Sequence, residues 1–354
     1  MSAVGVVTIR RRYWQCRCGV AGGSYAADGL LGLDGRFSRT VQKHACRLSA
    51  DVSFAATREH LHEMLGVSVC AETIRTLVEA HGKAMSRFQP LDASTAAAFQ
   101  AASGAVEFAV DAGKVNTREE GWKDLKIAVI SKRESGEPAL PTGWEEQRLP
   151  AATLVLAFAM IATSKVFRRS WRSRLRRLGV TSFAAVHALG DGAGWIWKSV
   201  TRALTGCVQT LDVFHASERL AKAAAKLFGE GTTQARAAFE RGRSLLIAQG
   251  WAGVCVWIAE LLDVTEESER ERRRAITDGV VTYFSKHVSR LNYAERLAAG
   301  RAIGSGVVEG QAKTLGLRLK ARGARWKKAH VRPMASLVCV RHSPHWDSYW
   351  AIAA

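Results

Sequence analysis

The chain of 354 residues is poor in negative charge, with 32 acidic residues against 51 Lys and Arg and a net charge of +19. This deficit favours a polyanionic partner, either nucleic acid or an anionic membrane surface. Long hydrophobic runs are missing as well. The most apolar run, AATLVLAFAMIAT at 151–163, is shorter than the roughly 20 residues that span a bilayer, and a basic segment follows it. Nucleic acid is therefore favoured over membrane.

Several targeting and enzyme motifs are also absent from the sequence. The N-terminus lacks the basic, apolar and small-residue order of a signal peptide. The chain has no G-x-S-x-G elbow, no Walker loop, no H-E-x-x-H and no dinucleotide-binding fingerprint. These motifs therefore offer no competing active site, and we expect a cytoplasmic protein that associates with the nucleoid when it is bound to DNA.

The seven cysteines are odd in number and irregular in spacing, so we expect most of them to be reduced, buried small residues. Cys16 and Cys18 form the one pair that resembles a zinc knuckle. A tetrahedral zinc site needs four ligands, and one pair does not complete it.

The N-terminal third favours helices after a short basic segment. Residues 1–32 are typical of the end of a zinc-ribbon-like segment followed by a linker. Within 33–98 we predict three helices: one capped by Ser38, a second over 54–65 and a third over 71–85, with a turn at Gly66. This layout is typical of a helix-turn-helix that binds DNA, and a plain helical hairpin is the alternative.

The pattern then becomes α/β. Within 99–215, the segment 106–114 alternates and predicts a strand that stops at Asp-Ala-Gly, and 122–131 predicts a second strand. Residues 151–163 fit a strand or a helix, and 182–189 and 207–214 contain short β-like runs. Residues 216–300 return to helical patterns, and 301–354 contain a basic helix. We therefore expect an α/β catalytic domain interrupted by an all-helical insertion.

Three acidic residues stand where these elements begin or end. Asp111 closes an apolar strand, Asp191 lies between two glycines, and Glu309 follows the Gly-rich start of the basic helix. Each has a plain alternative: a turn-forming aspartate, a loop residue, and a surface acid at a helix start. Together, three acids on separate elements of a basic chain indicate a phosphodiester site with two ions of Mg²⁺ or Mn²⁺. His215 could contact a phosphate there, or be a capping or buried histidine.

At this point the motifs GDGAGWIW, LDVFHASERL, IGSGVVEGQAK and LRLKARGARW resemble, in order and spacing, the transposases of the ISKra4 family. The broader resemblance is to Mutator-type DDE enzymes with an RNase H-like fold, and it covers about residues 10–350. It implies that Asp111, Asp191 and Glu309 are the catalytic and metal-binding triad. It also implies that Asp212 and His215 form an Asp-x-x-His signature. The helical stretch 216–300, between Asp191 and Glu309, would then be the insertion domain.

The resemblance further implies a function. The expected enzyme is an insertion-sequence transposase that cleaves and joins strands in DNA transposition and recombination. Its expected partners are double-stranded DNA, as terminal inverted repeats and target, and further copies of itself on that DNA. Two features depart from the family pattern: Ala112 follows the first aspartate where Gly is usual, and an earlier cysteine pair of the ribbon is not present.

Two basic segments are candidate DNA contacts. The first, KVFRRSWRSRLRR, runs over 165–177 and interleaves cations with aromatic residues, and the second follows Glu309. A solvated basic helix is the alternative for each. The predicted contacts are Arg168, Arg169, Arg172, Arg176, Arg318, Lys320, Arg322, Arg325 and Trp326, and Gly323 is expected to break the helix so that Arg325 and Trp326 turn inward.

Two other functional classes stay open on the sequence alone. One is a transposase-derived protein that binds DNA without catalysis, and the other is an RNase H-like nuclease that cuts without joining. Flanking inverted repeats with a target duplication in the genome would favour a mobile element.

Overall fold

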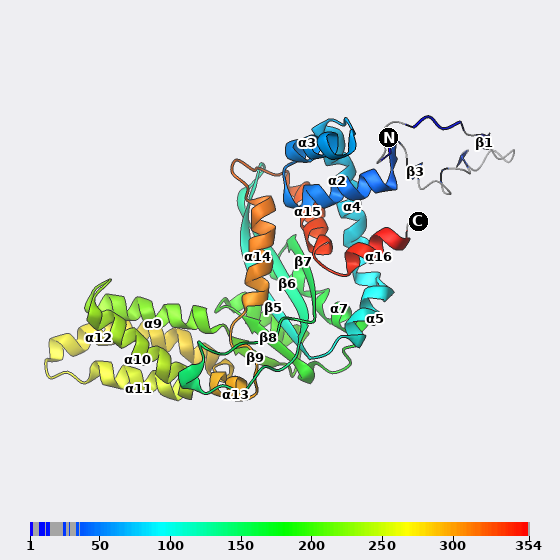
Figure 1. Cartoon of the computed structure of the whole chain (residues 1–354). Coiled ribbons are helices and arrows are strands. Elements are labelled where there is room, and N and C mark those ends of the chain that lie inside the picture. The colour runs from blue at the N-terminus through cyan, green and yellow to red at the C-terminus, as the bar shows by residue number, and fades with distance from the viewer. Residues whose placement is uncertain are drawn as a thin grey trace.

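A computed structural model describes residues 36–352 continuously and, before them, residues 1–2, 7–10, 12–14, 24–25, 28 and 33–34. The predicted zinc knuckle at Cys16 and Cys18 lies outside the described residues. The described chain is a mixed α/β fold around a five-stranded sheet with strand order β7-β6-β5-β8-β9 (Figure 1). Two small strand pairs precede it, β1 (Tyr13–Trp14) with β2 (Ser24–Tyr25) and β3 (Leu33–Asp34) with β4 (Phe37–Ser38).

The sheet combines an antiparallel meander with two parallel strands. β5 (Ala105–Thr117), β6 (Gly121–Arg133) and β7 (Leu154–Ile161) are antiparallel, and β8 (Val186–Gly190) and β9 (Val208–Leu211) continue the sheet parallel to β5. The prediction that the first strand stops at Asp111 was wrong, because its ladder with β6 runs on to the pair Thr117 and Gly121. Val115 and Thr117 are fully buried there, so the hairpin extension is part of the packed structure.

The predicted N-terminal helices are confirmed. α2 (Arg39–Asp51), α3 (Phe54–Leu65) and α4 (Ala71–Phe88) follow one another closely. The side chain of Ser38 accepts a hydrogen bond from the amide of Val41 and so caps α2. Gly66, at φ +61°, ends α3 in the left-handed conformation that glycine adopts without strain. After η1 (Gln89–Leu91), α5 (Ala93–Ala101) runs across the domain boundary predicted at 98.

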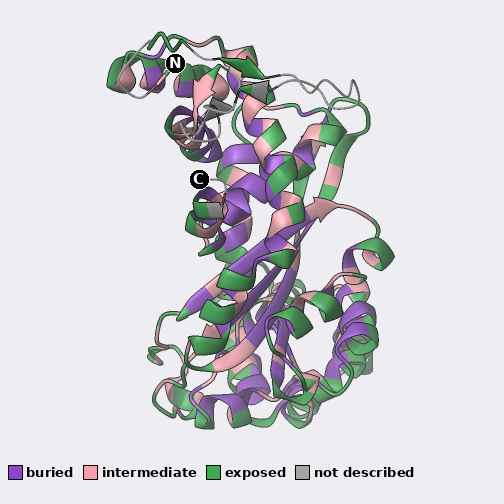
Figure 2. Cartoon of the chain, turned by 90° about the vertical axis from the view of Figure 1, so that its right-hand side faces the viewer, coloured by how far each residue is buried: buried purple, intermediate pink, exposed green. Residues whose placement is uncertain are grey.

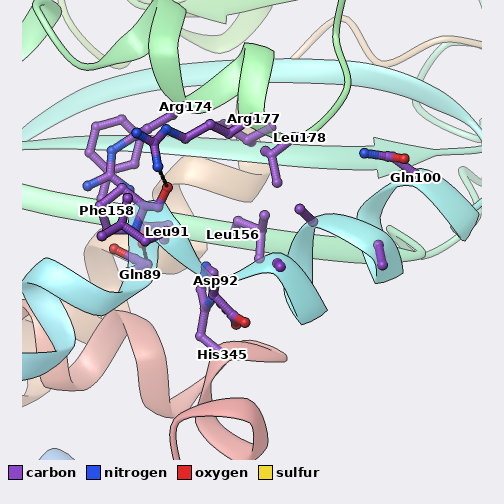
Figure 3. A pocket seen from close by; sticks show the side chains of 16 residues that line it. Gln89, Leu91, Asp92, Gln100, Leu156, Phe158, Arg174, Arg177, Leu178 and His345 are labelled. Carbon is purple, nitrogen blue, oxygen red and sulfur yellow. Dashed lines mark hydrogen bonds and ion pairs between the residues drawn. The ribbon is translucent and has the colours of Figure 1, made fainter. Parts of the chain in front are cut away.

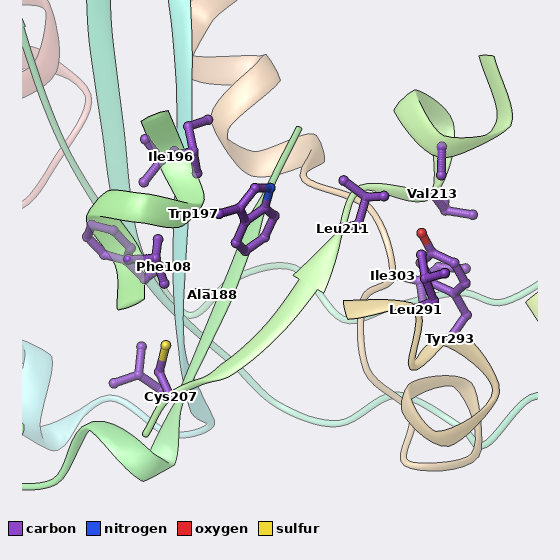
Figure 4. Packing of buried hydrophobic residues seen from close by; sticks show 14 of the residues in the cluster. Phe108, Ala188, Ile196, Trp197, Cys207, Leu211, Val213, Leu291, Tyr293 and Ile303 are labelled. Atoms are coloured by element: carbon purple, nitrogen blue, oxygen red, sulfur yellow. The ribbon is translucent and has the colours of Figure 1, made fainter. Parts of the chain in front are cut away.

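The strands of the sheet are largely buried (Figure 2), and the two faces of the sheet contribute to two separate cores. One core joins the sheet to α6 (Ser164–Arg168), α7 (Trp171–Arg177) and α8 (Gly194–Ala203), and Phe108 of the sheet and Trp197 of α8 belong to it (Figure 4). The rings of Phe108 and Trp171 lie 4.9 Å apart between their centroids. The other joins it to α14 (Gly306–Leu319), α15 (Lys328–Arg341) and α2–α4. The last helix, α16 (His345–Ile352), packs beside α5 and α15.

A helical region lies between β9 and α14 in the chain. Its helices project to one side of the sheet in Figure 1. Leu220, Ala224 and Leu227 are buried on one face of α9, as predicted. The region consists of α9 (Val213–Phe228), α10 (Thr233–Gln249), α11 (Trp251–Leu262), α12 (Glu267–Phe284), η4 (Ser285–Arg290) and α13 (Tyr293–Ala298), and η2 (Pro141–Gly143) and η3 (Phe183–Ala185) are single turns elsewhere.

Within the part of the chain that the structure describes, none of the helices has the length and hydrophobicity that a membrane span requires. The described cysteines are free thiols. Cys46, Cys207 and Cys339 are buried as predicted, whereas Cys70 and Cys255 are exposed on helical surfaces.

Candidate active site

Three adjoining strands of the sheet each have an aspartate directly after a residue that pairs with the neighbouring strand. In the parallel part of the sheet, Val110 of β5 pairs with Gly190 of β8, and Gly190 pairs with Leu211 of β9. Side chains alternate between the two faces of a strand, so the residues that come next share one face, the one that α14 covers. These residues are Asp111, Asp191 and Asp212.

α14 brings Glu309 over these aspartates. Ser305, just before the helix, donates hydrogen bonds from its amide and its hydroxyl to Oδ2 of Asp212, the latter at 2.7 Å. Glu309 lies in the first turn of α14, and its carboxylate, that of Asp212 and the imidazole of His215 offer ligand atoms within 4.8 Å of one another. The structure therefore brings His215 and Glu309 together with Asp212, and Asp111 lies near enough to Asp191 and Glu309 for its charge to act on both.

Hydrogen bonds divide the acids into two kinds. Both oxygens of Asp212 are used, because Oδ1 accepts from the amide of His215 at 2.9 Å and Oδ2 accepts from Ser305. In contrast, Asp111 accepts only from the amide of Ala112 and Asp191 only from that of Ala193. Among the described residues, no hydrogen bond reaches their second oxygens or the carboxylate of Glu309. Asp111, Asp191 and Glu309 therefore retain oxygens for a cation, and Asp212 anchors α9 to the loop before α14.

Burial and mutual repulsion act on the charges of this cluster. Burial raises the pKa of Asp191, and the carboxylates of Asp111 and Asp212 raise it further, against the opposing effects of the Ala193 amide and His215. Burial likewise raises the pKa of Glu309, and Asp212 and Asp111 add to the effect while His215 and Lys313 oppose it. Such crowding of carboxylates disfavours their ionised form, and a divalent cation between them would relieve the repulsion. The donor set of carboxylates and one imidazole fits Mg²⁺ or Mn²⁺.

Side chains from the helical region also reach the site, and no motif in the sequence predicted them. Tyr283 of α12 lies against Gly192, because a Cβ added to that glycine would lie 2.2 Å from the phenol oxygen. The guanidinium of Arg219, one helical turn after His215, lies 4.7 Å from the centroid of the Tyr283 ring. Phe214 is 56% exposed beside Gly304 and packs on Trp144 at 5.9 Å between ring centroids. Because Gly192 has no side chain, it allows this close approach of a residue more than 90 positions away in the sequence.

The basic helix predicted after Glu309 is shorter than expected. α14 ends at Leu319, and the chain turns at Gly323, which has φ +77°. Lys320, Arg322 and Arg325 are exposed, and the ammonium of Lys320 lies 4.0 Å from the Cβ position of Gly113 on β5. Trp326 turns inward as predicted, but the prediction that Arg325 does so was wrong, because its side chain is exposed.

Arg318 and Trp326 are buried together, which corrects their assignment as DNA contacts. Arg318 donates a hydrogen bond to the Ser49 carbonyl at 2.6 Å, and its guanidinium lies 4.8 Å and 4.9 Å from the ring centroids of Phe54 and Trp326. Trp326 is 8% exposed and donates to the Leu319 carbonyl. These side chains connect the end of α14 to α2 and α3, so they present little surface to a phosphate.

The first basic segment, 165–177, faces in two directions. Phe167 and Trp171 are fully buried and hold the segment against the sheet. Arg169, Arg172 and Arg176 are exposed, and Arg168 is partly exposed. Arg174 and Arg177 instead line a separate cavity of about 370 Å³ between α5, α7 and α16 (Figure 3). None of the clustered acids of the candidate site lines this cavity.

Comparison of the chain with models of known protein families finds no match, and comparison with curated proteins finds none either.

Proposed function

We propose that this chain is a DDE transposase, as its resemblance to the ISKra4 family implies, which cleaves and joins DNA strands with Mg²⁺ or Mn²⁺ held by Asp111, Asp191 and Glu309. The observation that supports the proposal is that Asp111 on β5 and Asp191 directly after β8 follow paired residues, that the charge of Asp111 acts on Glu309 of α14, and that these carboxylates keep oxygens without a hydrogen bond among the described residues of a strongly basic chain. In the proposed RNase H-like fold, α9–α13 form the helical insertion between the second and third catalytic acids.

Asp111, Asp191 and Glu309 would hold the divalent ions, which would activate the attacking oxygen and stabilise the leaving oxygen. In cleavage, water attacks a phosphodiester, and the P–O bond to the 3′ oxygen breaks to leave a 3′ hydroxyl. In joining, that hydroxyl attacks a phosphodiester of the target and displaces its 3′ oxygen. Each step forms one P–O bond and breaks another, so no further reactant is needed.

The chain's own residues would position the DNA for these steps. Asp212 fixes the start of α9, and this places His215 where its imidazole can donate a hydrogen bond to a phosphate oxygen. We propose that α3 and α4 act as the helix-turn-helix that recognises the ends. The exposed cations proposed to hold flanking phosphates are Arg169, Arg172, Arg176, Lys320, Arg322 and Arg325.

The test uses a plasmid that carries the coding sequence with its genomic flanks, incubated with the purified protein and Mg²⁺. We expect strand breaks in the flanks and joined products, and the Asp191→Asn and Asp111→Asn variants should lose both while still binding the flanks. Asp278→Asn, an exposed change of the same kind on α12, is the matched control and should behave as wild type.

The two other classes predict different results. Binding without any metal-dependent cleavage by the wild type would favour a silent DNA-binding protein. Cleavage without joined products would favour an RNase H-like nuclease. Near wild-type cleavage by Asp191→Asn would overturn the assignment of the triad.

A further inference from the structure

A hollow with a strongly positive lining lies between α6 and α8. Its volume is about 510 Å³. The residues that line it are Ser164, Lys165, Arg168, Gly194, Trp195, Lys198, Ser199 and Arg202. The sequence pattern indicated the segment with Lys165 and Arg168 as a candidate DNA contact. It did not indicate Lys198 and Arg202 of α8, which form the opposite wall.

The positive charge of this hollow is not compensated locally. Lys165 and Arg168 are three residues apart on α6, and Lys198 and Arg202 are four apart on α8, so each helix directs two cations to the same space. No Asp or Glu is among the described residues that line it. Four cations gathered without a carboxylate repel one another, and an anion in the hollow would remove that repulsion.

Both walls of the hollow are fixed by packing. Phe167 is fully buried next to Lys165 and Arg168, and Ile196 and Trp197 are buried beneath the exposed face of α8. Trp195 lines the hollow, and the ammonium of Lys126 lies 4.4 Å from the centroid of its ring, which adds another positive charge. The cations therefore project from helices that are held by packing, and little conformational entropy would be lost when a ligand binds.

The hollow and the acidic site share one segment of chain. α8 begins at Gly194, three residues after Asp191, and the amide of Ala193 between them donates to the Asp191 carboxylate at 2.8 Å. The hollow, whose lining includes Gly194 and Trp195, therefore begins within four residues of Asp191 in the chain, although α8 packs on the sheet face opposite α14.

We propose that this hollow binds consecutive backbone phosphates of the DNA strand that leaves the acidic site, an inference that rests on the proposed function. Lys198 and Arg202 are separated by one helical turn, about 6 Å along the axis, and this suits a repeating anion better than a single small one. Contacts to backbone phosphates carry no sequence information, so binding at the hollow should be independent of sequence.

The experiment measures DNA binding in EDTA, without catalysis, for the double variant Lys198→Ala/Arg202→Ala on a duplex of mixed sequence. Losing two phosphate contacts should reduce the slope of log affinity against log salt concentration by about 1.8. The control is Lys222→Ala/Arg236→Ala, which removes the same charge from cations that are each paired with a glutamate one turn away. The control slope should equal that of wild type, and a second pair, Lys165→Ala/Arg168→Ala, should repeat the effect if the first variant folds poorly.

Equal slopes for the α8 variant and wild type would overturn the proposal. A second result would also overturn it: inorganic phosphate binds the wild type and not the variant, while the salt slope of DNA binding is the same for both. That result would identify a site for a small anion. This test is independent of the test of the proposed function. A protein that cleaves no DNA strand can still show the reduced salt slope in the variant, and an active enzyme can show no reduction.

Discussion

Asp212 differs from the other acidic residues of the site in how its oxygens are used. Its side chain is fully buried and accepts three hydrogen bonds, from the amide of His215 and from the amide and hydroxyl of Ser305. These bonds join the end of β9, the start of α9 and the loop before α14. The residue therefore holds together the elements that carry His215 and Glu309.

We predict that Asp212→Ala lowers the free energy of unfolding by about 1–3 kcal/mol, because it leaves buried donors without an acceptor. Ser305→Ala removes only the hydroxyl and should cost about 1 kcal/mol or less. Urea denaturation of both variants measures the difference. If Asp212→Ala were as stable as wild type yet no longer bound Mn²⁺, Asp212 would be a ligand instead of an anchor.

At the scale of elements, the two ends of α14 lie in different surroundings. Glu309 is in the first turn, at the candidate acidic site, and Arg318 is in the last turn, inside the core with Phe54 and Trp326. Burial lowers the pKa of the Arg318 guanidinium to about 10. The cations that remain exposed lie beyond the helix, on the turn around Gly323.

Arg318→Ala and Arg322→Ala should therefore act in opposite ways. We expect Arg318→Ala to lower the free energy of unfolding by about 1–3 kcal/mol, since it removes a charged hydrogen bond and leaves a void between two rings. The salt dependence of DNA binding by the Arg318→Ala variant should match that of wild type. Urea denaturation and binding titrations measure the two effects, and a shallower salt slope at full stability would return Arg318 to the DNA surface.

Arg322→Ala combined with Arg325→Ala is the complementary test on the same segment. Both side chains are exposed, so the free energy of unfolding should change by less than about 0.5 kcal/mol. Loss of flanking phosphate contacts should impair joining on both pre-nicked and intact ends. Wild-type joining on both substrates would remove these arginines from the DNA path.

The elements with local signals were the ones that the sequence predicted well. Ser38 and Gly66 fix helix ends through their own backbone neighbours, and the structure has α2 and α3 where these residues predict them. The end of β5 was missed because burial of Val115 under distant residues extends the strand beyond a turn-like tripeptide. The end of α14 was missed because Trp326 must turn back to reach the Leu319 carbonyl.

At the scale of the whole molecule, the candidate site draws on regions far apart in the sequence. Alternation and turn residues pointed to Asp111 and Asp191, but the shared register that sets them side by side arises only when β5 and β8 pair across an intervening hairpin and two helices. Tyr283 and Arg219 reach the site from the helical region, and neither carries a motif. Local chemistry is visible in a sequence, whereas long-range pairing is decided by packing.

The crowding of acids at this junction predicts how the stability of the whole protein depends on pH. Burial and neighbouring carboxylates raise the pKa of Asp191 above 3.8 and that of Glu309 above 4.5. For a raised pKa, the stabilising contribution is complete below the ordinary value and is lost as pH rises through the folded value. In EDTA, these two groups should therefore lower the free energy of unfolding as pH rises from about 4 toward neutrality.

Other carboxylates change the stability with pH in the opposite direction. Hydrogen bonds from Lys123 and Arg272 lower the pKa values of Glu120 and Glu269 to about 2. The variant Asp191→Asn separates the contribution of Asp191 from theirs. We expect the difference in unfolding free energy between Asp191→Asn and wild type, measured in EDTA, to grow in favour of the variant as pH rises. Adding Mn²⁺ near neutral pH should reverse the order, since an ion at 100 times its dissociation constant stabilises wild type by about 2.7 kcal/mol. Asp278→Asn should follow wild type under both conditions. Urea denaturation across this pH range gives the answer, and a wild type that gains no stability from Mn²⁺ over Asp191→Asn would mean that these acids do not form a metal site.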